Sequence, residues 1–236
     1  MGRHPGAWRR LVTEEAPADP DLPALAAFVA ANTRLQAPPH VPEIRLHLAD
    51  EAVDLWHRTE AELETIGLPP PYWAFAWAGG QALARHVLDH PDLVAGRSVL
   101  VFAAGSGLEA VAAVKAGARH VLATDIDRYA LAAMTLNAAA NGVAFAMSGA
   151  DWIGAPVEGY EVVLLGDVFF ERPLADRVGA WAASAVAAGA LVLVGDPGRS
   201  YLPRDRMDAL ADYRVPTTRA LEDAEIKHTT VWRFRG

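Results

Sequence analysis

The chain has 236 residues, of which 52% are hydrophobic and 21% charged, so it can bury a large core, and its length favours one domain. It contains no cysteine, which excludes disulfides, thiolate metal sites and a cysteine nucleophile. Its formal net charge of −8 and the absence of an apolar run of roughly 18 residues argue against nucleic acid and membrane partners. The absence of cysteine fits a reducing compartment, and we expect a cytoplasmic protein.

The first 40 residues are rich in proline and alanine, and one helix is expected there from Pro23 to Asn32. The pattern then changes, with a strand expected at 41–48 and an amphipathic helix at 49–63. Gly79 and Gly80 lead into a further helix. We interpret residues 1–40 as a partly flexible N-terminal extension with helical and strand character.

From residue 98 onward, apolar runs alternate with helical segments. Five strands are expected in chain order, at 98–105, at 120–127, within VAFAMSGADW (143–152), at 160–170 and at 190–198, and most of them are rich in Val and Leu and bounded by Gly or Asp. Such runs are typical of strands buried on both faces, and their alternation with helices favours a doubly wound parallel α/β sheet. The chain ends in two β-rich segments with a short acidic connection, which favours an antiparallel edge hairpin.

A glycine turn, Gly105-Ser106-Gly107, joins the first of these strands to a helix. Such a turn lets a ligand approach the backbone near the positive end of the helix dipole. The next strand ends at Asp125, whose carboxylate can accept both hydroxyl protons of a ribose, whereas Asp127 is better placed as a helix N-cap. These residues favour adenosine binding over an ordinary strand-to-helix turn.

The identity of the adenosine cofactor depends on the later strands. The sequence GSGLEA at 105–110 formally matches the dinucleotide fingerprint, so a nicotinamide-dependent oxidoreductase stays open. Asp151 and Trp152 follow the third strand, where an acid can bind the adenine amino group and an indole can cover the base. Residues 166–170 (GDVFF) place a carboxylate and two rings after the fourth strand, which suits a sulfonium and an amine, although either ring is as consistent with a core position.

From about Val41 to Trp232 the chain resembles the seven-strand methyltransferases and, among them, the electron transfer flavoprotein β-subunit lysine methyltransferase family. Six stretches in the family's order carry the resemblance: VPEIRL (41–46), YWAFAWAGGQAL (72–83), TDID (124–127), GDVFFE (166–171), GDPGR (195–199) and TTVWRF (229–234). The resemblance implies a Rossmann-like, doubly wound, seven-stranded sheet, mostly parallel, with an antiparallel C-terminal edge hairpin. A single methyltransferase domain is then expected at 41–236.

The resemblance further implies S-adenosylmethionine as the cofactor and S-adenosylhomocysteine as its product. With the reasoning above, the expected cofactor-binding residues are Trp77, Ala103, Gly105, Gly107, Asp125, Asp151, Trp152 and Gly166. The amine pocket is implied to consist of Asp167, Phe169 and Phe170. Asp167 is expected to orient the amine and stabilise the product cation rather than to act as a general base, because its charge favours the ammonium.

The chain departs from the family pattern at two places. The first glycine motif of the family reads acid-x-Gly-x-Gly-x-Gly, but Val101 and Ala103 stand at the acid and at the first glycine. The acid that helps to hold the methionine end is therefore missing, so affinity is reduced or another group takes its place. Phe170 stands where tyrosine is usual, which removes a hydroxyl from the amine pocket and predicts successive transfers to trimethyl-lysine.

The implied reaction is N-methylation of a lysine in the β subunit of electron transfer flavoprotein, with ribosomal proteins as a second substrate class. Arg199 is a candidate for contact with the protein substrate. The alternatives are a pyridine- or nicotinamide-type small-molecule N-methyltransferase, the oxidoreductase, and a cofactor-binding module without catalysis. The eight histidines lack metal-ligand spacing, so no metal is expected.

Overall fold

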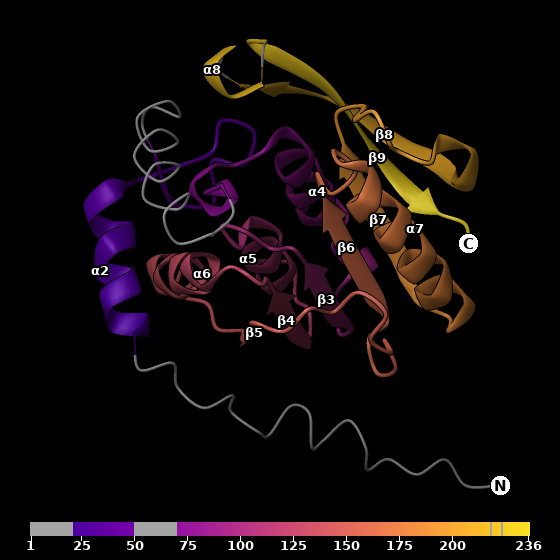
Figure 1. Ribbon diagram of the computed structural model, residues 1–236, viewed down its shortest axis with the longest axis horizontal. Helices are drawn as coiled ribbons and strands as arrows, with labels where there is room; N and C mark the ends of the chain where they lie inside the picture. The colour runs from indigo at the N-terminus through magenta and orange to yellow at the C-terminus, as the bar shows by residue number, and fades with distance from the viewer. Residues whose placement is uncertain (1–20, 50–69, 218, 223) are drawn as a thin grey trace, which may run out of the picture.

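A seven-stranded sheet with the strand order β5-β4-β3-β6-β7-β9-β8 forms the centre of the computed structural model, which describes residues 21–49, 70–217, 219–222 and 224–236 (Figure 1). Strands β5 to β7 in this order run parallel, and β9 is antiparallel to both of its neighbours. This confirms the expected mostly parallel sheet with an antiparallel edge hairpin. The strands are β3 (Ser98–Phe102), β4 (His120–Thr124), β5 (Ala146–Ser148), β6 (Val162–Gly166), β7 (Leu191–Asp196), β8 (Met207–Pro216) and β9 (Ile226–Phe234).

Both faces of the sheet are covered, which explains the continuous apolar runs in the sequence. Because side chains alternate along a strand, Val99 and Val101 of β3 point to one face, and Leu100 and Phe102 point to the other. The first face packs against three helices and the second packs against α7 (Figure 1). The helices are α4 (Ala78–Asp89), α5 (Leu108–Lys115), α6 (Arg128–Ala140) and α7 (Arg172–Ala187).

The chain changes direction in the sheet between β3 and β6. From β3 it continues outward to β4 and β5, and it then returns to build β6 and β7 on the other side of β3. The loops that follow β3 and β6 therefore diverge, and a parallel sheet binds ligands at this point, outside the carboxyl ends of its strands.

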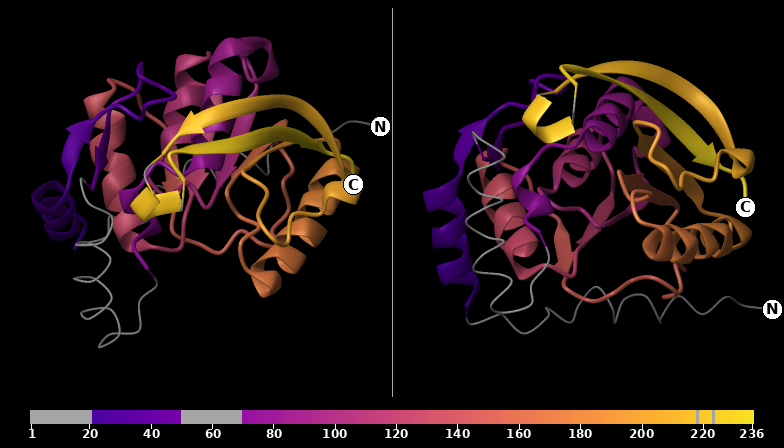
Figure 2. Two further views of the ribbon diagram at one scale, coloured as in Figure 1. Left: turned by 90° about the horizontal axis from the view of Figure 1, so that it is seen from above. Right: turned by 45° about the horizontal axis from the view of Figure 1, so that its top comes forward.

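The C-terminal hairpin passes beside α4 before it reaches the sheet edge (Figure 2). Strands β8 and β9 pair antiparallel, with a bulge between Ala209 and Ala211. Part of the segment expected to be β-rich instead forms a short helix, α8 (Arg219–Glu222), within the connection between the two strands. This helix brings an acidic side chain back toward α4.

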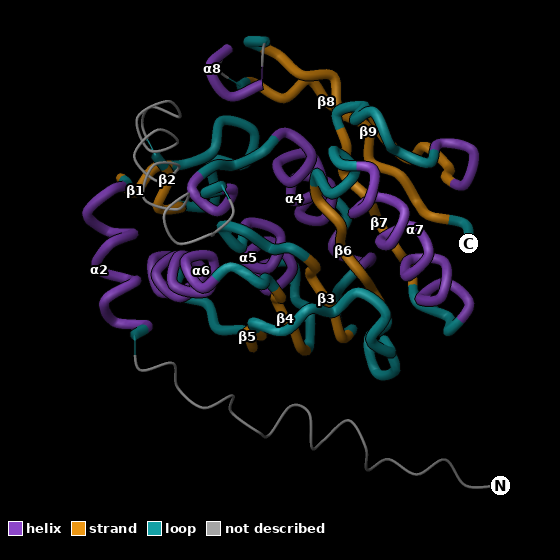
Figure 3. Tube along the Cα trace, in the orientation of Figure 1, coloured by secondary structure: helices purple, strands orange, loops and turns teal. Residues whose placement is uncertain are grey.

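The N-terminal segment packs onto the domain. Helix α2 (Leu22–Asn32), which confirms the helix expected from Pro23, lies along α6 with Val29 fully buried (Figure 2). Strand β1 (Arg34–Gln36) pairs antiparallel with β2 (Leu46–Leu48) apart from the main sheet (Figure 3).

The strand expected at 41–48 is shorter than predicted, because residues 41–44 form turns in which Val41 N donates to Pro38 O and Ile44 N donates to Val41 O. Almost all of the helix expected at 49–63 lies outside the described residues. Within the described part of the chain, no helix is both long and apolar enough to cross a bilayer.

Asn137 of α6 joins β2 to the glycine turn. Its Oδ1 accepts from His47 N at 2.7 Å, its Nδ2 donates to Ser106 O at 2.8 Å, and the residue is fully buried. We expect Asn137→Ala to lower the free energy of unfolding by about 2–4 kcal/mol, because a buried polar group left unpaired costs roughly 1–3 kcal/mol. Urea denaturation measures the loss.

Asn141, the C-cap residue of the same helix, provides the matched control. Its side chain bonds Arg45 N at 3.0 Å and Arg45 O at 2.6 Å, but the residue is only half-buried and these two hydrogen bonds are open to water, which can replace them. Asn141→Ala should cost less than about 1 kcal/mol. Equal losses in the two variants would contradict the role given to Asn137.

Candidate active site

A cavity of about 560 Å³ opens at the carboxyl ends of β3, β4 and β6. Its volume is in the range of small-molecule and cofactor pockets. Most of the residues that the sequence pointed to line it: Trp77, Ala103, Gly105, Asp125, Asp151, Gly166, Asp167 and Phe170. The sheet edge therefore gathers residues from segments as far apart in the sequence as Trp77 and Phe170.

Two of the expected aromatic residues do not line this cavity. The Trp152 indole donates to Ser148 Oγ at 3.2 Å and lies edge-on to Tyr160, with ring centroids 5.9 Å apart. Phe169 is fully buried in the cluster against α7. Phe169 and Phe170 are adjacent in the loop that follows β6, and their side chains diverge, one into the core and one into the cavity.

Apolar side chains of other residues take the place expected for the Trp152 ring. Ile126 and Ile153 both line the cavity, and 67% of Ile126 is exposed. The Asp151 carboxylate accepts from Ile153 N at 2.9 Å, and this local turn sets the direction of the Ile153 side chain. The flat face of a base can therefore be covered by two isoleucines instead of an indole.

Gly107 is also absent from the cavity lining, and its role is conformational. It is the N-cap of α5 with a φ of 79°, a left-handed conformation that favours glycine. A Cβ atom there would lie 2.8 Å from Met134 Cγ, so the position also allows α6 to pack closely.

Asp125 supports the glycine turn directly. Its Oδ2 accepts from Gly105 N at 2.9 Å, and its Oδ1 accepts from Asp127 N at 3.0 Å. Burial raises the pKa of Asp125, and these backbone hydrogen bonds oppose that shift. Each carboxylate oxygen has a second lone pair, so Asp125 keeps the capacity to accept ribose hydroxyls. Asp127 accepts from Tyr129 N at 2.8 Å, which confirms its expected role as the N-cap of α6.

Asp167 is held in the cavity by hydrogen bonds to both of its carboxylate oxygens. Its Oδ2 accepts from Gly79 N, and its Oδ1 accepts from Arg199 Nε at 2.7 Å. Burial raises the pKa of Asp167 to about 7, although the Arg199 cation opposes the shift. The residue has a φ of 57°, which aims the side chain back toward the first turn of α4.

Arg199 links Asp167 to the C-terminal hairpin. Its Nη2 lies 3.1 Å from Glu222 Oε1 of α8, and the same oxygen accepts from Ala78 N at 3.2 Å. The Asp196 carboxylate accepts from Arg199 N at 2.7 Å and from Gly198 N at 2.6 Å, and this turn positions the guanidinium. The first two N–H groups of α4 thus bind carboxylates, the charge that a helix N-terminus favours.

Aromatic rings form the wall of the cavity next to Asp167. The Tyr72 ring centroid lies 5.3 Å from that of Phe170 and 5.9 Å from that of Trp77. The Trp77 indole donates to Tyr72 O at 2.9 Å, and the Arg199 guanidinium lies 6.0 Å from the Trp77 ring centroid. Sequence reasoning did not single out Tyr72, although it begins the aromatic stretch at 72–77.

Glu109 is a cavity residue that sequence reasoning missed. It is 7% exposed, and a Cβ atom added at either Gly80 or Gly166 would collide with its carboxylate, which therefore occupies the space left by two glycines. Burial, with a smaller contribution from the negative charge of Asp167, raises its pKa to about 7. An acid in the first turn of a helix is ordinary, so its position gave no signal of this environment.

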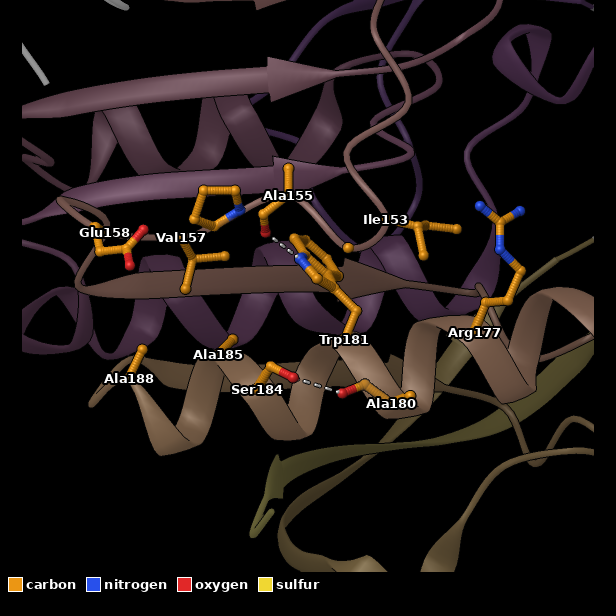
Figure 4. A pocket seen from close by; sticks show the side chains of 12 residues that line it. Ile153, Ala155, Val157, Glu158, Arg177, Ala180, Trp181, Ser184, Ala185 and Ala188 are labelled. Carbon is orange, nitrogen blue, oxygen red and sulfur yellow. Dashed lines mark hydrogen bonds between the residues drawn. The ribbon is translucent and has the colours of Figure 1, made fainter. Parts of the chain in front are cut away.

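A second cavity, of about 470 Å³, lies between α7 and residues 153–158 (Figure 4). Trp181 Nε1 donates to Ala155 O at 2.8 Å, and Ser184 Oγ donates to Ala180 O at 3.2 Å, so these polar groups are satisfied internally (Figure 4). It holds none of the acids described above. Among the described residues, no group of three or more His, Asp and Glu side chains is arranged to hold a metal ion.

Ala103 has a φ of 49°, a conformation that costs a residue with a Cβ atom roughly 1–2 kcal/mol. We expect Ala103→Gly to raise the free energy of unfolding by up to about 1 kcal/mol, after the larger chain entropy of glycine is subtracted. Ala104→Gly is the control, since Ala104 is buried and has no positive φ, and it should destabilise. Urea denaturation distinguishes the two, and destabilisation by both would contradict the prediction.

Glu109→Gln should stabilise the protein in a pH-dependent way. Because the folded-state pKa of about 7 exceeds the ordinary value near 4.5, stability falls as the pH rises through this window, and the cost is complete above it. We expect the variant to gain on the order of 3 kcal/mol near pH 8 and little near pH 5. Urea denaturation at both pH values tests this, with the exposed Glu158→Gln as the control, and a gain independent of pH would contradict it.

Comparison with known proteins agrees with this geometry. A family model described as ribosomal protein L11 methyltransferase (PrmA) matches residues 82–164. The electron transfer flavoprotein beta subunit lysine methyltransferase of Xenopus laevis is 36% identical over 214 residues, which cover 88% of this chain and 86% of the relative. The human protein of the same name is 33% identical over 227 residues, with 90% and 83% covered.

Among solved structures, Trm5b from Pyrococcus abyssi matches with a TM-score of 0.52 at 13% identity, over 86% of this chain and 56% of that chain. This similarity shows the fold alone. The identity shared with the lysine methyltransferases over most of both chains shows more: the protein belongs to the electron transfer flavoprotein β-subunit lysine methyltransferase family and is an S-adenosylmethionine-dependent enzyme.

Proposed function

We propose that this enzyme methylates the ε-amine of a lysine in the β subunit of an electron transfer flavoprotein. The relatives that match most of the chain carry that substrate in their names. The observation that carries the proposal is the juxtaposition, in one cavity, of the glycine turn and Asp125 with Asp167 and an aromatic wall. The first pair suits a nucleoside, and the second suits an amine.

The residues of the cavity fit S-adenosylmethionine. Gly105 presents backbone without a side chain, and the Asp125 carboxylate has lone pairs for the ribose. Trp77 and the two isoleucines supply apolar surface at either side of the turn. When bound, this cofactor supplies an electrophilic methyl group on its sulfonium.

The lysine amine must lose its proton before it can attack. With an ordinary lysine pKa near 10.4, deprotonation at neutral pH costs about 4.6 kcal/mol, at roughly 1.4 kcal/mol for each pKa unit. A wall formed by Tyr72, Trp77 and Phe170 removes water from the amine and so lowers its pKa. The charge of Arg199 is balanced by Asp167 and Glu222, so Arg199 changes the pKa of the amine little.

Asp167 is assigned to orientation rather than to proton removal. Gly79 N and the Arg199 guanidinium already donate to its two oxygens, and a carboxylate has about four acceptor positions. A remaining position can accept a hydrogen bond from the amine and stabilise the methylated cation. Holding the two reactants in line, with water excluded, then provides most of the rate.

Incubation of the enzyme with methyl-labelled S-adenosylmethionine and purified electron transfer flavoprotein tests the proposal. We expect label on a lysine of the β subunit, up to trimethyl-lysine because Phe170 lacks a hydroxyl, as measured by mass spectrometry of the peptides. Label on ribosomal protein, or on a small heterocyclic amine, but none on the flavoprotein would contradict the proposed substrate.

Asp167→Asn should reduce methyl transfer by about 100-fold or more, because a misplaced reactant costs that much, while S-adenosylhomocysteine affinity changes little. Asp176→Asn, on the exposed side of α7, is the matched control and should leave both unchanged. Calorimetry and the labelling assay give the two readouts. A parallel loss of binding and transfer would contradict the assignment of Asp167 to the amine.

A further inference from the structure

The amino acid end of the cofactor carries an ammonium group, which needs an acceptor or a negative charge inside the cavity. Val101 stands where the family motif has its acid, is 1% exposed and packs in the apolar core. It offers neither charge nor hydrogen bond. We propose that the Glu109 carboxylate binds this ammonium group and replaces the missing acid from the next element of the fold. This inference rests on the methyltransferase function.

The position of Glu109 supports the proposal. It is the second residue of α5, directly after the glycine turn, and its carboxylate lies against Gly80 of α4 and Gly166 at the end of β6. Gly166 and Glu109 line the same cavity as Asp167. The carboxylate therefore lies at the switch point of the sheet, between the nucleoside side and the amine side of the cavity.

The two glycines show that this space is built for a carboxylate. A side chain at Gly80 would come within 2.9 Å of Glu109 Oε1, and one at Gly166 would collide with the same oxygen. Both positions belong to elements other than α5. A glutamate whose only role was to lie in the first turn of a helix would not require glycines on two neighbouring elements.

The charge of Glu109 is not balanced within the described part of the chain. Glu109 is 7% exposed and forms no ion pair in this part of the chain. The charge next to it is that of Asp167, which is also negative. Arg199 is already engaged by Asp167 and Glu222. A buried carboxylate without a cation costs stability, and a ligand ammonium recovers that cost as binding free energy.

Two ligands separate the ammonium from the rest of the cofactor. S-adenosylhomocysteine carries the amino acid end, whereas 5′-methylthioadenosine has the same nucleoside and sulfur without it. We expect Glu109→Gln to weaken S-adenosylhomocysteine by about 10- to 100-fold near pH 8, the range for a hydrogen bond to a charged group. Its affinity for 5′-methylthioadenosine should stay within about twofold of the wild type, as measured by calorimetry.

Glu158→Gln, which removes a charge from the exposed rim of the second cavity, is the matched control and should change neither affinity. Equal S-adenosylhomocysteine affinity in wild type and Glu109→Gln would overturn the proposal, and so would equal weakening of both ligands, which would assign Glu109 to cavity shape. A folded wild type that binds neither ligand would overturn the methyltransferase function as well. Thermal unfolding of each variant confirms that the protein titrated is folded.

Discussion

The close contact between α4 and the ends of β6 and β7 determines the geometry of the whole site. It depends on backbone without side chains: a Cβ atom at Gly195 would collide with Gly79 O, and one at Gly79 would collide with Gly195 O and with Asp167. Only at this spacing can the first N–H groups of α4 reach the carboxylates of Asp167 and Glu222. The helix terminus, rather than a cation alone, thus stabilises acids at the sheet edge.

The site carries more negative charge than its cations balance. This excess lowers the free energy of unfolding of the protein without its ligands. Burial raises the pKa of both Glu109 and Asp167 to about 7, because removal from water in the folded protein disfavours the charged form of each carboxylate. Arg199 compensates only part of it. The cofactor brings positive charge to this excess, and the amine becomes a cation as it is methylated, so cofactor and product supply part of the missing positive charge.

The elements that could be predicted from sequence are those determined by local pattern. The β3 and β6 strands were recognisable because they are apolar without interruption, and the glycine turn and Asp125 follow from strand ends. The side-chain directions after a strand end were not predictable. Whether Trp152 or Ile153 faces the cavity depends on Tyr160 and on a turn at Asp151, which are contacts of the folded chain. Glu109 was missed because only the assembled fold shows two glycines beside it.

Because the C-terminal hairpin is synthesised last, the two halves of the site become complete at different times during synthesis. Strand β9 lies between β7 and β8 and is the last strand in the sequence, and Glu222 is the last residue of α8, which precedes it. A nascent chain that has emerged as far as Arg199, three residues after the end of β7, already holds the glycine turn, Asp125 and Asp167, but Arg199 still lacks one of its two acidic partners. The residues of the nucleoside half of the cavity therefore leave the ribosome before those that complete the amine half. The catalytic centre is complete only after the final strand has emerged.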